Sequence, residues 1–274
     1  MNPIYIGTSG WIYKSWNKTF YPDDIRSREH LEFYATQFPT VEINATFYRL
    51  PTLPMIKGWH QRAPRNFLFA VKGSRFITHM KKLANLNGGL NKFIRRIQPL
   101  KEHLGPVLWQ LPPNLGYHPE RLDRFLAKTS RSMRHAVEFR HPSWYHESGT
   151  FEVLKNHNAA HVSLSSQGVP MNLTTTADFV YIRFHGLKHG AAHDYTRDEL
   201  KPWAEHIRHE ARHGRTVFAY FNNDLNVRAP GNARMLIEMV DDVLPPKDAH
   251  PPGSRARARN ASPLLKSTAA TLDC

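Results

Sequence analysis

Residues 180–185 read Val-Tyr-Ile-Arg-Phe-His, and this stretch decides the fold. Ile182 and Phe184 alternate with Arg183 and His185, which is the period of two expected of a β-strand with different side chains on its two faces. In parallel barrels, polar side chains at the carboxyl ends of the strands carry the chemistry. The stretch therefore indicates a strand whose charged end faces a site.

Seven further short runs of the same character are distributed along the chain. The eight expected strands are Ile4–Thr8, Thr40–Asn44, Phe67–Gly73, Val107–Leu111, Ala136–Arg140, His161–Ser165, Val180–His185 and Val217–Asn222. Amphipathic segments separate most of them, and the clearest are Asp24–Phe38, Pro119–Thr129, Arg197–His213 and Asn232–Val243. Alternating strands and helices in this number predict an α/β fold of the TIM-barrel-like (β/α)₈ type. Residues 166–178 have no helical period, so we expect an irregular connection between strands six and seven.

Composition limits the classes of protein that fit. The chain has 274 residues, with 37 Lys and Arg against 23 Asp and Glu, a formal charge of +14. Its single cysteine, Cys274, excludes an internal disulfide and a zinc cluster built of cysteines. The apolar runs are much shorter than the roughly 18–20 residues of a membrane span, and the first residues do not resemble a signal peptide. We therefore expect a cytoplasmic protein without a membrane partner.

The composition changes near Pro245. From there the chain is rich in proline, alanine and arginine and has few apolar residues that a core would bury. We expect one barrel domain over residues 1–244 and a disordered, basic, proline-rich tail over residues 245–274.

Polar residues occur at the ends of most expected strands, spaced by two and therefore on one face. They are Glu42, Asn44, Lys72, Gln110, Glu138, Arg140, Arg183, His185, Asn222 and Asp224. We predict that their side chains meet at the carboxyl end of the barrel. Burying so many charges requires partners or water, so the alternative is that carboxylates and cations merely neutralise one another.

Further candidates lie in the loops after the strands or beside the strand ends. They are Arg49, His79, Trp109, His141 and Trp144. Guanidinium groups bind phosphate with two hydrogen bonds, and aromatic rings stack on bases or sugars. These residues predict a receptor for a flat, anionic ligand, although rings near strand ends also serve as core packing.

Two groups of histidines have the spacing of metal ligands. His185, His189 and His193 are interrupted by glycines that favour a loop, where the spacing carries little information. His206, His209 and His213 share one face of an expected outer helix, near a helix end that favours cationic imidazole. We therefore expect neither a metal nor a cofactor, although Glu138, His141 and His185 keep a metal conceivable at the barrel end.

Several motifs, taken in order, resemble one family. They are Gly7-Thr8-Ser9-Gly10-Trp11, Thr40-Val41-Glu42-Ile43-Asn44, Thr46-Phe47-Tyr48-Arg49, Thr78-His79, Leu108-Trp109-Gln110-Leu111-Pro112-Pro113, Glu138-Phe139-Arg140-His141-Pro142-Ser143-Trp144, Tyr181-Ile182-Arg183-Phe184-His185-Gly186 and Tyr220-Phe221-Asn222-Asn223-Asp224. The chain is thereby similar, over residues 4 to about 240, to the YecE-like family, a domain of unknown function catalogued under the number 72. The resemblance implies a TIM-barrel-like fold and a set of pocket residues without an established activity. It also implies an Asp where this chain has Ser165, and a glycine-containing turn where residues 225–228 stand.

Two classes of function fit these features. The first is an enzyme acting on a phosphorylated or nucleic-acid-derived anionic substrate, and glycoside hydrolysis is a less favoured reaction of the same carboxylates. Its catalytic candidates are Glu42, Glu138, His185 and Asp224; its substrate-binding candidates are Asn44, Arg49, Lys72, His79, Trp109, Gln110, Arg140, His141, Trp144, Arg183 and Asn222. The second class is a non-catalytic nucleic-acid-binding protein that uses the basic charge for phosphates. Basic residues converging on one pocket favour the first class, and a stripe across the surface favours the second.

Overall fold

The computed structural model describes residues 3–86 and 88–244. The tail predicted for residues 245–274 lies outside the described residues.

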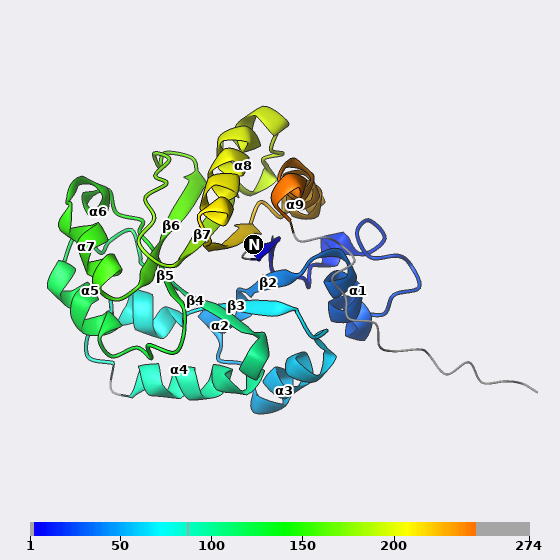
Figure 1. Ribbon diagram of the computed structural model, residues 1–274. Coiled ribbons are helices and arrows are strands. Elements are labelled where there is room, and N and C mark those ends of the chain that lie inside the picture. Colours follow the sequence, from blue (N-terminus) through cyan, green and yellow to red (C-terminus); the bar gives the residue numbers. More distant parts are fainter. Residues whose placement is uncertain (1–2, 87, 245–274) are drawn as a thin grey trace, which may run out of the picture. The chain divides into compact units, whose positions relative to one another are not determined.

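Eight parallel strands close into a barrel in sequence order, with β1 paired to β2 on one side and to β8 on the other (Figure 1). They are β1 Ile4–Ser9, β2 Thr40–Ile43, β3 Leu68–Lys72, β4 Leu104–Gln110, β5 His135–Glu138, β6 Ala159–Ser166, β7 Phe179–Gly186 and β8 Thr216–Phe221. At the closing seam, Ile4 lies opposite Val217 and Thr8 opposite Phe221. The predicted (β/α)₈ barrel is confirmed.

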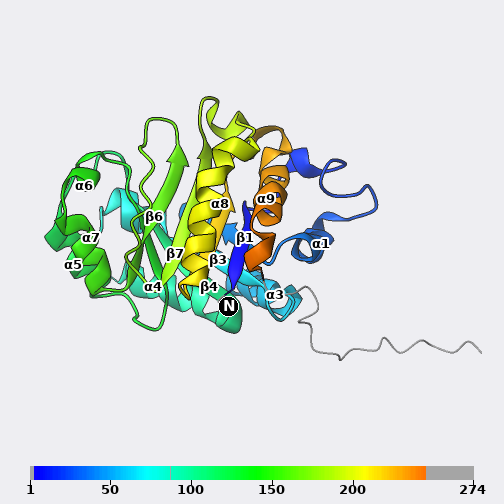
Figure 2. The ribbon, with the colours of Figure 1, turned by 45° about the horizontal axis from the view of Figure 1, so that its top comes forward.

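Helices cover the outside of the barrel, and Figure 2 shows α8 and α9 lying along the strands. The helices are α1 His30–Gln37, α2 Ala45–Tyr48, α3 Leu53–Arg62, α4 Gly89–Ile97, α5 Pro119–Leu126, α6 Ser143–His146, α7 Gly149–Asn156, α8 Arg197–Arg212 and α9 Arg228–Met239. A capping box starts α8: the Thr196 hydroxyl accepts from the Glu199 amide at 3.3 Å, and the Glu199 carboxylate accepts from the Thr196 amide at 2.9 Å. The sequence pattern places this helix correctly because both of its ends carry local signals.

The connection between β6 and β7 contains no helix in residues 167–178, all of which the structure describes. Thr176 instead fastens this segment against β6. Its hydroxyl donates to the Ala159 carbonyl at 2.7 Å and accepts from the His161 amide at 2.8 Å. The expected irregularity therefore has a side-chain anchor where the other connections have a packed helix.

The barrel interior is filled by side chains on the inward parity of the strands. Its lower part, toward the amino ends of the strands, is apolar and comprises Tyr5, Leu68, Ala70, Leu108, Ala136, Ala160, Val162, Phe179, Tyr181, Phe218 and Tyr220. Small residues from β3, β5 and β6 leave room for the rings from β7 and β8. The polar residues at the carboxyl ends rest on this packed floor.

Candidate active site at the carboxyl ends of the strands

Arg183 on β7 is the centre of the polar cluster. Its guanidinium donates to both oxygens of Glu42 at 2.7 and 2.9 Å and to one oxygen of Glu138 at 2.5 Å. All three side chains are fully buried. One guanidinium charge balances only one of the two carboxylates, and Arg140, which pairs with Glu138, supplies the second cation.

Glu42 on β2 has every strong acceptor position filled. Besides Arg183, the Ser9 hydroxyl donates to Oε1 and the Tyr181 hydroxyl donates to Oε2, each at 2.6 Å. Burial raises the pKa of Glu42, but the Arg183 charge and these hydrogen bonds outweigh burial, so the pKa lies below its usual range. The arrangement leaves Glu42 no free lone pair for a ligand and favours a positioning role over the predicted role of catalytic base.

Glu138 on β5 is held in the same manner from two sides. Arg183 donates to Oε2 at 2.5 Å, and Nε of Arg140 donates to Oε1. Against the effect of burial, the two guanidinium charges hold the pKa of Glu138 well below its usual range. Because both of its oxygens accept from guanidinium groups, the geometry favours Glu138 as a residue that positions cations over the predicted role of base.

Arg183 is a predicted substrate-binding residue, but its contacts favour an internal role. It has no group left for a ligand, since all of its nitrogens face Glu42, Glu138 or His185. Arg183 is an internal partner, whereas Arg140, whose side chain is 20% exposed, lies at the mouth.

His185 lies above the ion pairs, between the arginines and β8. Its Nε2 is 2.7 Å from Nη1 of Arg183 and 3.0 Å from Nη2 of Arg140, and both of these nitrogens can only donate. Nε2 is therefore an acceptor, and Nδ1 lies 3.0 Å from the side-chain nitrogen Nδ2 of Asn222. Burial, followed by the Arg183 charge, lowers the pKa of His185 to about 4, so the ring is neutral at pH 7.

Backbone geometry after His185 keeps this ring at the end of the strand. Gly186 has φ +90°, and a side chain there would collide with the Gly190 carbonyl oxygen. Only glycine fits this turn without strain.

Asn222, Asn44 and Asp224 continue the polar surface from β8 toward β1 and β2. The side-chain amide of Asn44 donates to Oδ1 of Asn222 at 3.3 Å, and the Trp16 indole N–H donates to Asp224 at 2.6 Å. Burial raises the pKa of Asp224 above its usual value. Asp224 thus lies at the edge of the cluster, held by an aromatic residue from the loop after β1.

Lys72 completes the cluster from β3. Its Nζ lies 4.4 Å from the centre of the Phe47 ring, and burial, followed by the Arg183 charge, lowers its pKa to about 8. The His79 ring packs against the Phe47 ring, with ring centres 4.9 Å apart. Burial and the Lys72 charge lower the pKa of His79. The cations at the mouth therefore repel one another.

Gln110 reaches the same region from β4. Its Oε1 is buried and has no hydrogen-bond partner among the described residues, and the same holds for Oδ1 of Asn44. Buried acceptors without partners are costly unless water or a ligand supplies a donor.

Two tryptophans expected to contact a ligand do not face the cluster. Trp109 is buried in the helix layer, against Phe93 and Phe125, and its N–H donates to His135 at 3.1 Å. Because Trp109 neighbours inward-facing Gln110, the alternation of a strand already requires it to point outward. The prediction that Trp109 binds substrate is wrong.

Trp144 is buried as well, stacked on Phe139 at 4.6 Å, with its N–H donating to the Leu115 carbonyl at 2.8 Å. It fastens the loop after β5 and cannot contact a ligand, so this prediction is also wrong. His141 lies beside it, 2.8 Å from the Ser143 hydroxyl, and Arg49 is exposed just after α2. Neither belongs to the hydrogen-bonded network around Arg183.

Ser165 points away from the cluster. Its hydroxyl lies 2.8 Å from the Tyr195 hydroxyl, between the barrel and α8. Ser165 therefore does not line the cluster.

Ser9 and Tyr181 contribute directly to the network, although the sequence did not identify them as site residues. Both share the inward parity of identified neighbours: Tyr181 precedes Arg183 by two residues, and Ser9 ends β1. Applying the period of two to every strand would have found them.

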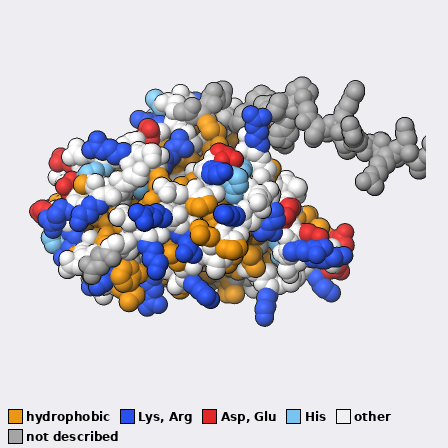
Figure 3. Space-filling model, turned by 90° about the horizontal axis from the view of Figure 1, so that it is seen from below, with side chains coloured by type: hydrophobic (Ala, Val, Ile, Leu, Met, Phe, Trp, Pro, Cys, Tyr) orange, Lys and Arg blue, Asp and Glu red, His pale blue; other side chains and the backbone are white. Residues whose placement is uncertain are grey.

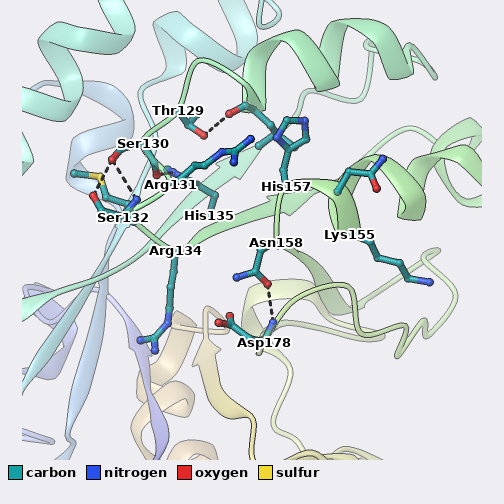
Figure 4. A pocket seen from close by; sticks show the side chains of 13 residues that line it. Thr129, Ser130, Arg131, Ser132, Arg134, His135, Lys155, His157, Asn158 and Asp178 are labelled. Atoms are coloured by element: carbon teal, nitrogen blue, oxygen red, sulfur yellow. Dashed lines mark hydrogen bonds between the residues drawn. The ribbon is translucent and has the colours of Figure 1, made fainter.

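A separate hollow of about 370 Å³ lies at the opposite end of the barrel (Figure 4). Its walls are the segments that precede β5, β6 and β7, and they include Arg131, Lys155 and Asp178. Arg134 also lines this hollow, and its guanidinium carbon lies 5.8 Å from the centre of the Phe218 ring in the barrel interior. Because catalytic residues of such barrels gather at the carboxyl ends, this hollow is not the candidate active site.

These features define a class of protein: a parallel (β/α)₈ barrel with a buried ion cluster at the carboxyl ends of its strands. Among the described residues, no helix is long and apolar enough to cross a membrane. The chain belongs to the family described as "Protein of unknown function DUF72", whose model matches residues 5–255. The resemblance seen in the sequence motifs is confirmed.

Relatives support the same assignment. UPF0759 protein YunF from Bacillus subtilis (strain 168) is 25% identical over 270 residues, covering 87% of this chain and 95% of the relative. A DUF72 family crystal structure from Thermotoga maritima MSB8 matches with a TM-score of 0.78 and 29% identity, over 88% of this chain and 100% of that one. One from Enterococcus faecalis V583 matches with a TM-score of 0.74 and 20% identity, over 87% and 95% of the two chains.

Proposed function

We propose that the carboxyl end of the barrel binds the anionic group of a phosphorylated or nucleotide-like substrate and promotes a proton transfer on it. The observation that carries this proposal is the charge of the cluster. Arg183 and Arg140 are paired with the carboxylates of Glu42 and Glu138, and Asp224 lies at the edge of the cluster beside Trp16. Lys72 forms no ion pair among the described residues, so its positive charge is available to an anion.

Arg140 and Lys72 are the two cations that a ligand meets first. Both side chains retain some exposure, whereas Arg183 beneath them has none. A guanidinium fork and an ammonium group together suit a phosphate better than a neutral ligand. An anion here would relieve the repulsion between these cations and raise the pKa of Lys72.

The neutral polar groups around these cations suit the remainder of a substrate. The unpartnered acceptors of Gln110 and Asn44 face the same region and would accept from hydroxyl or amino groups. A sugar or a base beside the phosphate offers such donors. This favours a phosphate ester over inorganic phosphate.

Proton transfer is assigned to His185 and Asp224. When an anion draws Arg140 toward itself, Nε2 of His185 loses one of its donors and becomes available as a base. Asp224, which lies at the edge of the cluster and accepts from the Trp16 indole at 2.6 Å, is the second group proposed to take part in the proton transfer. Glu42, Glu138 and Arg183 then act by fixing Arg140 and His185 in place.

The rim around the cluster suggests that part of the substrate remains outside. Tyr48, Phe76 and Met80 are exposed there, in the loops that follow β2 and β3, next to the exposed Arg49 and Arg75. Exposed rings beside arginines favour contact with bases and phosphates of a nucleic-acid chain. We expect such a substrate and this protein to meet in the cytoplasm.

The same rim is the reason to retain a second candidate, a nucleic-acid-binding protein without catalysis. On the face shown in Figure 3, Lys and Arg side chains are dispersed among apolar and uncharged areas. Convergence at the cluster therefore favours the enzyme as the first candidate.

Thermal-shift and binding titrations with phosphate esters, nucleotides and a short oligonucleotide at two ionic strengths test the proposal. A pocket ligand with two charged contacts loses little affinity with salt, whereas a chain engaging six or more phosphates loses about a thousandfold. Arg140→Lys should weaken binding, because a point charge replaces the fork, and Arg197→Ala on the outer surface should not. Equal binding by the Arg140 variant, or stabilisation by none of these ligands, would reject the anion site.

A further inference from the structure

Three potential metal ligands meet at the end of the barrel opposite the charged cluster. His60 lies near the end of α3, and Glu102 and His103 end the short 3₁₀ segment Gln98–His103 that leads into β4. Their ligand atoms lie within 4.8 Å of one another, and no other trio of His, Cys, Asp or Glu side chains in the described ranges meets this condition. The sequence gives little sign of this group because His60 lies 42 residues before Glu102.

His103 is already oriented in the way that metal-bound histidines are. Its Nδ1 lies 2.8 Å from the Phe67 carbonyl oxygen, which can only accept, so Nδ1 carries the proton. Nε2 therefore keeps its lone pair, and the ring is buried and fixed. A backbone carbonyl that holds the second ring nitrogen is the usual support of a histidine ligand.

Glu102 and His60 supply the movable part of the group. Oε1 of Glu102 lies 3.2 Å from Nε2 of His60 and 3.9 Å from Nε2 of His103. Lys101, with a backbone φ of +50°, directly precedes Glu102 and His103 in the chain. Both movable side chains reach solvent, so they can close around an ion.

We propose that His60, Glu102 and His103 bind a divalent cation of the zinc type, with water in the fourth position. In a tetrahedral zinc site with bonds of about 2.1 Å, ligand atoms lie about 3.4 Å apart, so the pair at 3.2 Å already fits and the others must approach. Two imidazoles and one carboxylate suit Zn²⁺ and similar ions better than Mg²⁺ or Ca²⁺. The bound ion ties α3 to the segment before β4, so it stabilises the barrel without entering the active site.

Zinc binding to the full-length, untagged chain tests this site. Cys274→Ser serves as the background, because a free thiolate also binds zinc. Competition against a chromophoric chelator should give one tight Zn²⁺ per chain, and saturating Zn²⁺ should raise the melting temperature by several degrees. His60→Ala and Glu102→Gln should each weaken Zn²⁺ binding by about tenfold or more and remove the rise in melting temperature.

His209→Ala is the matched control. This residue lies on α8, where its ring stands 4.1 Å from that of His213 with the spacing of a helical histidine pair. The control should leave the tight Zn²⁺ unaffected. His60 and Glu102 are partly exposed, so their variants should fold, which circular dichroism checks. Undiminished Zn²⁺ binding in both variants would show that the ion binds elsewhere. If the parent chain binds no Zn²⁺ tightly, His60, Glu102 and His103 form only an ion pair and the proposal fails.

Discussion

The two ends of the barrel interior are built from opposite kinds of residue. Toward the amino ends of the strands the side chains are apolar or aromatic, and Phe218 and Tyr5 stack there with ring centres 5.1 Å apart. Toward the carboxyl ends, Arg183 joins Glu42 and Glu138 in full burial. The difference shows that this barrel tolerates buried charge only where every charge has a partner, and that its surplus charge remains at the mouth.

Removal of Arg183 should have the largest effect. Arg183→Ala leaves Glu42 buried without a cation and Glu138 with Arg140 alone, which should lower the free energy of unfolding by about 5 kcal/mol. Urea unfolding followed by circular dichroism measures the loss. Arg197→Ala, at an exposed pair with Glu238, is the control and should cost less than about 1 kcal/mol. A stable Arg183 variant would mean that the carboxylates find other donors.

Truncation in the apolar layer should cost somewhat less. Phe218→Ala removes a ring that packs against Tyr5 and Phe179, so the free energy of unfolding should fall by about 3–4 kcal/mol. Anion binding by the folded fraction should be unchanged, because the cluster lies above this layer. Loss of anion binding in a folded Phe218 variant would show that the two layers are coupled.

Tyr181 joins the two layers, and its variant should have an intermediate effect. Tyr181→Phe keeps the ring but removes the hydroxyl that donates to Glu42 at 2.6 Å. A hydrogen bond to a buried carboxylate contributes about 2 kcal/mol, so unfolding should require correspondingly less urea. Tyr5→Phe, on the same floor, is the matched change outside the ion cluster. Equal losses of unfolding free energy in the two variants would show that the Tyr181 hydroxyl beside Glu42 contributes no more than the Tyr5 hydroxyl.

The smallest effect concerns pH and Lys72. The Lys72 pKa of about 8 means that the amine is charged at pH 7 and loses its proton as the pH rises to 9. Binding of sulfate, whose own charge is constant, should therefore weaken by about tenfold over this range, and the midpoint in the complex should lie above 8 because the anion favours the charged amine. Isothermal titration gives the affinities. Lys72→Met should bind weakly at both pH values; a parent affinity that does not change would exclude Lys72 as a ligand group.

The sequence predicted the barrel because each strand carries its own signal. The period of two in residues 180–185 continues into the observed β7, and the charged residues it places inward do meet. Position along a strand and face of a strand are local properties, so they can be deduced without knowing the partners.

The pairing inside the cluster could not be deduced in the same way. Whether Arg183 faces a ligand or Glu42 depends on how far β2 and β7 are staggered around the barrel, which no short stretch of sequence determines. Trp144 illustrates the same limit in a loop, where no periodicity assigns a direction. The outward orientation of the Trp109 side chain was predictable, since its neighbour Gln110 was already expected to face inward.

The seam between β1 and β8 has a consequence for how the chain folds during synthesis. β1 is made first but finds its second neighbour only when Val217–Phe221 has emerged, so one of its edges stays open for most of translation. An open parallel edge is a template for wrong pairing, and contacts so distant in sequence form slowly. Newly made copies of this protein should therefore depend on chaperones and on low local concentration more than a protein of the same size with local contacts would.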